Sequence, residues 1–395
     1  MLPLAFTLLA AQADQVYVKT IESFTPVQLD QRHKKLHKES AGAWTGLTAL
    51  KLSYLSPRSP GNTPRLSGAL FLPKDVKARG LVIYYHGTVA TRSYVPSRSA
   101  DYALNCAVTL VGQGFAVAMP DYVGLGDSGE IHPYPFGRIN AWSGIDMIQP
   151  SIKAAKDRGH DLGSRLFISG YSEGGAVAMW ATRLLQEQPQ LGHKVTASAP
   201  IAGPYDLTGA TAQSIISTQS NPKWRLGRSY LSGYLAYSAA RWVPGVKIED
   251  LFVPSMATYI PFVFKNAKSD KEVMEKLAAK ALQLKPMALS IRPIIQPKFA
   301  DALEAKDLSH PLIKALHEDN SHDWAPTTRM KLIALENDFI VTSENSRSAI
   351  KAIRARGVPE SLVDLHLIPD GTDHIKAEIP SILIAAKFFS ELAAK

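Results

Sequence analysis

Residues 165–175 of the chain read RLFISGYSEGG and join a short apolar run to a glycine-rich turn. The run at 165–169 has the length and apolar character of a strand buried on both faces. Residues 173–187, which follow, have a helical pattern. The G-x-S-x-G pattern at 170–174 therefore lies between a buried strand and a helix. This is the context in which a strand turns sharply into a helix and leaves a serine exposed at the tip.

The glycines of this turn have a steric reason. Side chains two residues before and after Ser172 would collide, so Gly170 and Gly174 are required. The helix N-terminus also directs backbone N–H groups toward developing negative charge. Ser172 is therefore a candidate nucleophile, and the alternative is a bystander serine in a glycine-rich turn.

Outward from this segment, apolar runs alternate with helical patterns. We expect further strands at 46–55, 66–72, 80–85, 115–119, 195–201, 330–335 and 362–367, and helices at 104–113, 140–156, 343–356 and 382–393. Residues 14–44 are polar and are expected to be helical or irregular. The alternation predicts an α/β fold, with a mostly parallel twisted sheet and helices on both faces.

The strand–helix rhythm breaks between residues 207 and 327, where prolines and helical segments such as 271–284 replace it. We interpret this region as a helical cap inserted between two parts of the core, 14–206 and 328–395. Its aromatic residues are too many for a solvated loop, and we expect some of them to face a substrate. They are Trp224, Tyr230, Tyr234, Tyr237, Trp242, Phe252, Tyr259, Phe262 and Phe264.

A serine nucleophile needs a base, and the base needs an orienting carboxylate. His374 lies in a polar loop after the last predicted strand, where α/β sheets build their sites. His366 is the competitor, but it falls within the strand pattern itself. The acid is expected after the strand at 330–335, where Asp338 is favoured and Glu336 is the alternative nearer the strand.

An oxyanion needs two N–H donors. One is expected from Glu173, directly after the serine. The other is expected from the loop after the strand at 80–85, where Gly87 allows close approach and Thr88 or Val89 presents its N–H. Two tyrosines near strand ends, Tyr122 and Tyr171, are candidate substrate-binding residues; Tyr122 could instead brace the oxyanion loop.

Several motifs together resemble the α/β-hydrolase superfamily. They are YYHGT at 84–88, PDYVGLGDS at 120–128, HPY at 132–134, GYSEGG at 170–175, LENDFIV at 335–341 and DH at 373–374. Within the superfamily they look like the bacterial and fungal secretory lipases and their esterase relatives. The resemblance implies hydrolysis of a small-molecule or lipid carboxylic ester, without metal or cofactor, under a cap that shapes the acyl pocket. It does not extend to the disulfides of many secreted lipases, because Cys106 is the single cysteine.

Composition narrows the partners. The formal charge is +9, but the 44 Lys and Arg residues are scattered among acidic ones. This pattern argues against a nucleic-acid arm and leaves transient contact with a membrane or lipid surface possible. The oligomeric state is left open. A serine peptidase, an acyltransferase and a non-catalytic binding protein remain as alternative functions.

Residues 2–13 are apolar and end in AQA before Asp14, which is typical of a signal peptide at 1–13. A basic segment before the apolar run is missing. Secretion or export to the periplasm is the expectation. No stretch approaches 18 uninterrupted apolar residues, so no transmembrane anchor is predicted.

Overall fold

The computed structural model describes residues 16–394, except 40–44, 62–64, 99, 219–221, 285–289 and 370–372. The expected signal peptide at 1–13 lies outside the described residues. Within them, no helix has the length and apolar character needed to span a bilayer.

The described residues form one nine-stranded sheet with the order β1-β2-β3-β5-β4-β6-β7-β8-β9. The first four strands in this order pair antiparallel, and the strands from β5 to β9 pair parallel. The mostly parallel sheet is therefore confirmed. The strands are β1 (Tyr17–Phe24), β2 (Leu47–Leu55), β3 (Arg65–Pro73), β4 (Leu81–Tyr85), β5 (Ala116–Pro120), β6 (Leu166–Tyr171), β7 (Val195–Ile201), β8 (Arg329–Leu335) and β9 (Val363–Ile368).

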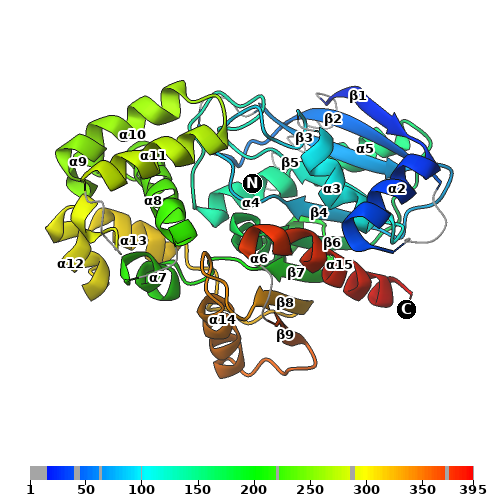
Figure 1. Cartoon of the computed structure of the whole chain (residues 1–395). Coiled ribbons are helices and arrows are strands. Elements are labelled where there is room, and N and C mark those ends of the chain that lie inside the picture. The colour runs from blue at the N-terminus through cyan, green and yellow to red at the C-terminus, as the bar shows by residue number, and fades with distance from the viewer. Residues whose placement is uncertain are drawn as a thin grey trace.

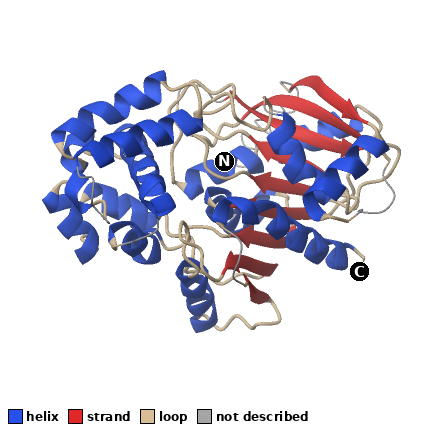
Figure 2. Cartoon of the chain, in the orientation of Figure 1, coloured by secondary structure: helices blue, strands red, loops and turns tan. Residues whose placement is uncertain are grey.

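Helices cover both faces of the sheet (Figures 1 and 2). One face packs against α2 (Pro26–His37), α3 (Ala100–Val111) and α15 (His374–Ala393). The other packs against α4 (Gly137–Ile145), α5 (Ile148–Lys156), α6 (Glu173–Glu187) and α14 (Glu344–Ala355). The apolar runs read from the sequence are buried for this reason: β4, β5 and β6 are buried along their whole length.

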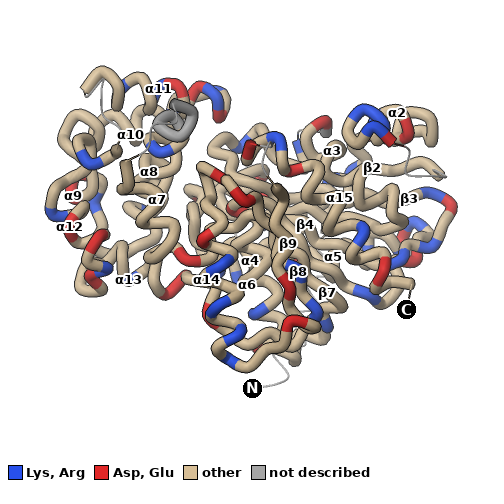
Figure 3. Tube along the Cα trace, turned by 60° about the horizontal axis from the view of Figure 1, so that its bottom comes forward, with Lys and Arg blue, Asp and Glu red and all other residues tan. Residues whose placement is uncertain are grey.

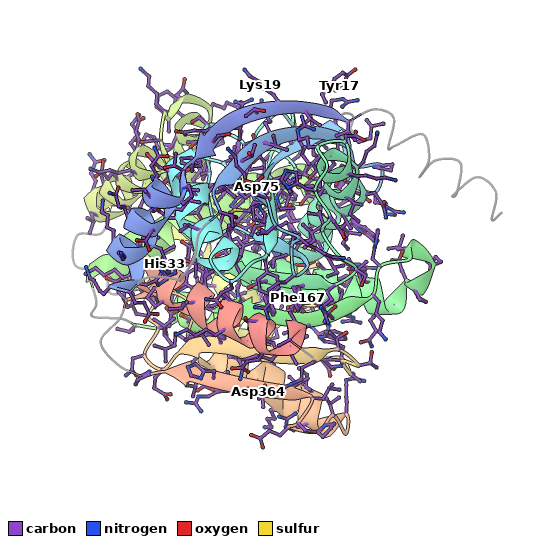
Figure 4. The ribbon with its side chains drawn as sticks, turned by 90° about the vertical axis from the view of Figure 1, so that its right-hand side faces the viewer. Tyr17, Lys19, His33, Asp75, Phe167 and Asp364 are labelled. Atoms are coloured by element: carbon purple, nitrogen blue, oxygen red, sulfur yellow. The ribbon has the colours of Figure 1, made fainter. Side chains whose placement is uncertain are left out.

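The two edges of the sheet differ from its centre. Figure 4 places Phe167 of β6 inside, whereas Tyr17 and Lys19 lie on edge strand β1 and Asp364 on the opposite edge strand β9. The expectation of a helical or irregular segment at 14–44 misses β1. This strand is mostly exposed, so its sequence lacks the apolar run of a buried strand, and its pairing with β2 defines it.

Three predicted helices have different bounds. The helix expected at 104–113 is α3, which begins at Ala100 and ends at Val111. The helix expected at 140–156 is divided into α4 and α5, which places Pro150 in the first turn of α5, where a missing N–H costs little. The last helix begins at His374 instead of residue 382. Pro380 lies inside it, and Asp373 caps its N-terminus by accepting the N–H of Lys376. Proline disfavours a helix interior, which is why the sequence pattern favoured a later start.

The region 207–327 is helical in its described part and forms a cluster beside the sheet (Figure 1). It has its own apolar core. Its elements are η2 (Leu207–Thr211), α7 (Ala212–Ile216), α8 (Pro222–Trp242), α9 (Ile248–Leu251), α10 (Pro254–Asn266), α11 (Asp270–Leu284), η3 (Arg292–Ile294), α12 (Pro297–Ala305) and α13 (Pro311–Glu318). We call this region the cap. In the view of Figure 3, basic and acidic residues are interspersed over cap and core.

The strand order also positions the site. β4 lies between β5 and β6, and Tyr85 at the end of β4 is paired with Gly170 of β6. The loops that follow β4 and β6 therefore start side by side at the carboxyl edge of the sheet, where open α/β sheets bind ligands.

Candidate active site

Ser172 lies at the tip of a sharp turn between β6 and α6. Its backbone has φ 56° and ψ −122°, a region that non-glycine residues rarely adopt. The turn tolerates no side chain on its flanks. A Cβ on Gly170 would lie 2.2 Å from the carbonyl oxygen of Gly174, and a Cβ on Gly174 would lie 2.0 Å from that of Tyr85. The strained backbone holds the serine hydroxyl away from the sheet.

Three side chains form a continuous hydrogen-bonded chain. Ser172 Oγ lies 2.9 Å from Nε2 of His374, and Nδ1 of His374 lies 2.6 Å from Oδ2 of Asp338. The other carboxylate oxygen, Oδ1, accepts the N–H groups of Ile340 and Val341 at 2.8 and 3.0 Å. These two N–H groups hold the carboxylate in place beside the imidazole. Because Nδ1 donates to the carboxylate, Nε2 is free to accept the serine proton.

The structure brings Asp338, and not Glu336, to His374. The Glu336 side chain is 41% exposed and pairs with Arg347 at 2.5 Å. His366, the competing base, lies on edge strand β9. Its position within the strand pattern favours packing into the core, but its side chain is exposed.

The two expected oxyanion donors belong to residues that line the same cavity as Ser172. The N–H of Glu173 belongs to the first turn of α6, where backbone N–H groups have no partner within the helix. Residues 86–91, which we call the oxyanion loop, follow β4. Within this loop, a Cβ on Gly87 would lie 3.7 Å from Cβ of Ser172, an ordinary van der Waals contact, so the loop lies against the serine but this distance does not require glycine. Thr88 lines the same cavity as Ser172.

Comparison with known proteins shows what the sequence and the fold resemble. Residues 91–216 match the model of the secretory lipase family, a segment that includes Ser172 but neither Asp338 nor His374. A protein from Legionella pneumophila described as a hydrolase superimposes with a TM-score of 0.82 at 24% identity, over 95% of this chain and 97% of that one. The fold is that of the α/β-hydrolases.

Two further structures share it. The rice cell wall degrading esterase LipA from Xanthomonas oryzae gives a TM-score of 0.79 at 21% identity, covering 94% of this chain and 96% of that chain. Candida antarctica lipase A in its closed state gives 0.56 at 14%, covering 95% and 81%. No curated protein sequence gave a match.

In this α/β-hydrolase fold, the side chain after the serine is tied to a histidine. Glu173 Oε1 lies 2.7 Å from Nε2 of His132, and the exposed fractions of the two side chains are 2% and 1%. The opposite nitrogen, Nδ1 of His132, lies 2.8 Å from the carbonyl oxygen of Val123 and must donate to it. The contact with Glu173 therefore contains one shared proton. The sequence contained His132 only as part of the HPY motif and indicated no partner for it.

Tyr122 and Tyr171 lie behind the reacting groups and are not part of the cavity wall. The hydroxyl of Tyr122 donates to the carbonyl of His86 at 2.8 Å, and that of Tyr171 donates to the carbonyl of His374. Each supports the backbone of a residue in the site, so Tyr122 braces the oxyanion loop. Burial raises the pKa of Tyr122 well above its ordinary value, so its phenol is neutral and able to donate.

His86, the first residue of the oxyanion loop, is fully buried. Its Nδ1 donates to the carbonyl of Gly87 at 2.7 Å. Burial lowers the pKa of His86 to about 4, so the ring is neutral at pH 7.

A cavity that is partly open to solvent begins at Ser172 and extends between the cap helices. Near the serine its wall includes Thr88, Tyr134 and Glu173. The rest of the wall is mainly aliphatic and comes from α7, α8, α9, α12, α13 and the loops around them: Leu207, Ala212, Ile215, Leu231, Leu235, Ala236, Leu251, Ile291, Ile295, Leu303, Leu312 and Leu316.

Most of the aromatic residues expected to face a substrate do not line the cavity. Of that set, Phe252 lines the cavity. Tyr237 stacks on Phe264, Tyr234 stacks on Tyr134, and Phe262 is 55% exposed. The side chain of Trp224 lies outside the described part. Most aromatic rings of this set therefore pack within the cap, whereas the cavity wall is mainly aliphatic, with Tyr134, Phe252 and Phe299 as its aromatic members. Among the described residues, no group of three or more metal-ligating side chains occurs.

Proposed function

We propose that the protein is a serine hydrolase that cleaves carboxylic esters. Ser172 Oγ attacks the ester carbonyl while Nε2 of His374 takes its proton. The C–O bond to the alcohol then breaks, and His374 returns the proton to the leaving oxygen. Water, deprotonated by His374, attacks the acyl-enzyme and releases the acid, and Ser172 regains its proton.

The remaining groups have defined tasks. Asp338 holds the imidazole in the correct tautomer and stabilises the imidazolium that forms during each step. The N–H groups of Glu173 and Thr88 bind the oxyanion of the tetrahedral intermediate. These hydrogen bonds are stronger to the oxyanion of the intermediate than to the carbonyl oxygen of the bound ester.

The observation that carries the proposal is the hydrogen-bonded chain from Ser172 Oγ to Asp338 at the mouth of an apolar cavity. An aliphatic wall of this kind suits the hydrocarbon chain of an acyl group and offers few partners for a peptide backbone. The match of residues 91–216 to the secretory lipase family also supports ester hydrolysis.

Labelling tests the nucleophile directly. A fluorophosphonate probe should modify Ser172, located by peptide mass, and the Ser172→Ala variant should lose about five orders of magnitude in turnover of p-nitrophenyl esters. Near-normal activity of this variant would overturn the proposal. Matched amide substrates and alcohol acceptors in the same assay separate an esterase from a peptidase or an acyltransferase.

We also propose that the protein is exported. The similarity of residues 91–216 to secretory lipases supports this location, together with the apolar segment 2–13. Intact mass of protein recovered from outside the cytoplasm should place the N-terminus at or near Asp14. Recovery of active external protein that still begins at Met1 would contradict cleavage.

A further inference from the structure

The oxyanion loop is held from two sides, and one of them is the cap. The core side fixes its beginning, because Tyr122 donates to the carbonyl of His86. The remainder of the loop, from Thr88 to Thr91, contacts Tyr234 of α8 and Asp270 of α11, both in the cap. These cap residues are more than 140 positions away in the sequence.

Helix α8 contacts the loop through Tyr234. Its hydroxyl donates to the carbonyl oxygen of Val89 at 3.0 Å, and this contact is buried. The ring of Tyr234 also stacks on Tyr134, with 4.7 Å between the ring centroids and 5° between the planes. Tyr134 in turn shares a hydrogen bond with the side chain of Thr88.

Helix α11 contacts the loop through Asp270 at its first position. Oδ1 of Asp270 accepts the backbone N–H of Ala90 at 2.6 Å, and the N–H of Thr91 is a second donor to the same carboxylate. Burial raises the pKa of Asp270, and these two N–H groups act against that rise.

We propose that Asp270 is a positioning residue for the oxyanion hole: it ties the cap to the loop that presents the N–H of Thr88 beside Ser172. The inference rests on the proposed ester hydrolysis. It makes the cap part of the apparatus that sets the rate of the chemical step, in addition to forming the wall of the cavity.

The role of Asp270 sets how much kcat should fall when it is replaced. Loss of one oxyanion donor costs roughly 100- to 1,000-fold in kcat. Removal of Asp270 retains the N–H of Thr88 but no longer holds it in position, so Asp270→Ala should lower kcat by about 10- to 100-fold with little change in KM. Asp270→Asn retains an acceptor oxygen for Ala90 and should recover most of the lost kcat.

The experiment compares these variants with Glu272→Ala. Glu272 lies in the same first turn of α11, but it accepts the N–H of Lys268 and pairs with Lys276, away from the oxyanion loop. Its removal should leave kcat within about twofold. Short and long p-nitrophenyl esters are both measured. A displaced oxyanion donor lowers kcat equally on both, because the reacting carbonyl is the same, whereas a distorted cavity raises KM for the long ester selectively.

Thermal unfolding of each variant shows whether the fold is retained. If Asp270→Ala does not fold, Asp270→Asn and Tyr234→Phe provide the test, since the latter keeps the ring stack and loses the hydrogen bond to Val89. Unchanged kcat in a folded Asp270→Ala, or a loss confined to KM for long esters, would overturn the proposal. Failure of the proposed function would instead appear as a wild-type protein that hydrolyses neither ester, or as a Ser172→Ala variant that keeps near-normal activity.

Discussion

Glu173, the residue after Ser172, has its carboxylate 2.7 Å from Nε2 of His132, and both side chains are almost completely buried. The same residue supplies the proposed oxyanion N–H, so a buried pair holds the first turn of α6 in place. Asn140 adds a longer contact to the same oxygen at 3.5 Å.

Removal of one partner should leave the other buried and unpaired. We expect His132→Ala to lower the free energy of unfolding by about 3–5 kcal/mol, measured by urea denaturation. In a Glu173→Gln background, the same change should cost only about 1–3 kcal/mol, because a neutral amide is left instead of a carboxylate. Equal costs in both backgrounds would contradict a charged or proton-sharing pair.

Asp338 and Glu336 can be separated by a pair of isosteric variants. Asp338→Asn should lower kcat by roughly ten-thousand-fold, because the amide favours the wrong tautomer of His374. Glu336→Gln should leave kcat near the wild-type value, since it loses only a surface pair with Arg347. Steady-state kinetics on a short ester measures both, and a larger loss in the Glu336 variant would reverse the assignment.

The far part of the cavity should set the acyl-chain length. Leu303 on α12 lines the cavity, and α12 lies on the outer side of the cap (Figure 1). Leu303→Trp should fill this part and lower kcat/KM for long-chain esters, by about 1–3 kcal/mol per methylene that no longer fits, while short esters react normally. Leu308→Trp, at a position 47% exposed, is the control. A parallel loss on all chain lengths would show that the acyl chain lies elsewhere.

Burial of His86 predicts a pH dependence of stability. Its pKa is about 4 in the folded protein and 6.5 as the ordinary value. Between these pH values the unfolded chain binds more protons than the folded protein, so the free energy of unfolding rises with pH. The contribution of His86 is fully present above pH 6.5 and is lost as pH falls toward 4.

Across this pH range, His86 should lower the free energy of unfolding by about 3 kcal/mol. Thermal unfolding between pH 4 and 7 should therefore show a flatter acid limb for His86→Gln than for the wild-type protein. Superimposable acid limbs would show that His86 is protonated without penalty in the folded state.

Local patterns were sufficient for much of the core. The apolar runs that became β4, β5 and β6 and the strand–GYSEGG–helix segment could be located from sequence, because burial on both faces demands continuous apolar residues and the sharp turn demands glycine. α6 and β7 have the bounds that the pattern predicts. Edge strand β1 could not be located in this way, because an exposed strand is defined by its neighbour.

Other features exist only because the chain is folded. The sequence favoured Asp338 over Glu336, but only the fold shows which carboxylate meets His374. The N–H groups of Ile340 and Val341 hold Asp338 inward, whereas Arg347 holds Glu336 at the surface. The partner of Glu173 is 41 residues away, and the contact of Ala90 with Asp270 spans 180. A periodic pattern records which face of an element is buried, but a hydrogen bond between distant side chains depends on how the cap and the sheet are packed together.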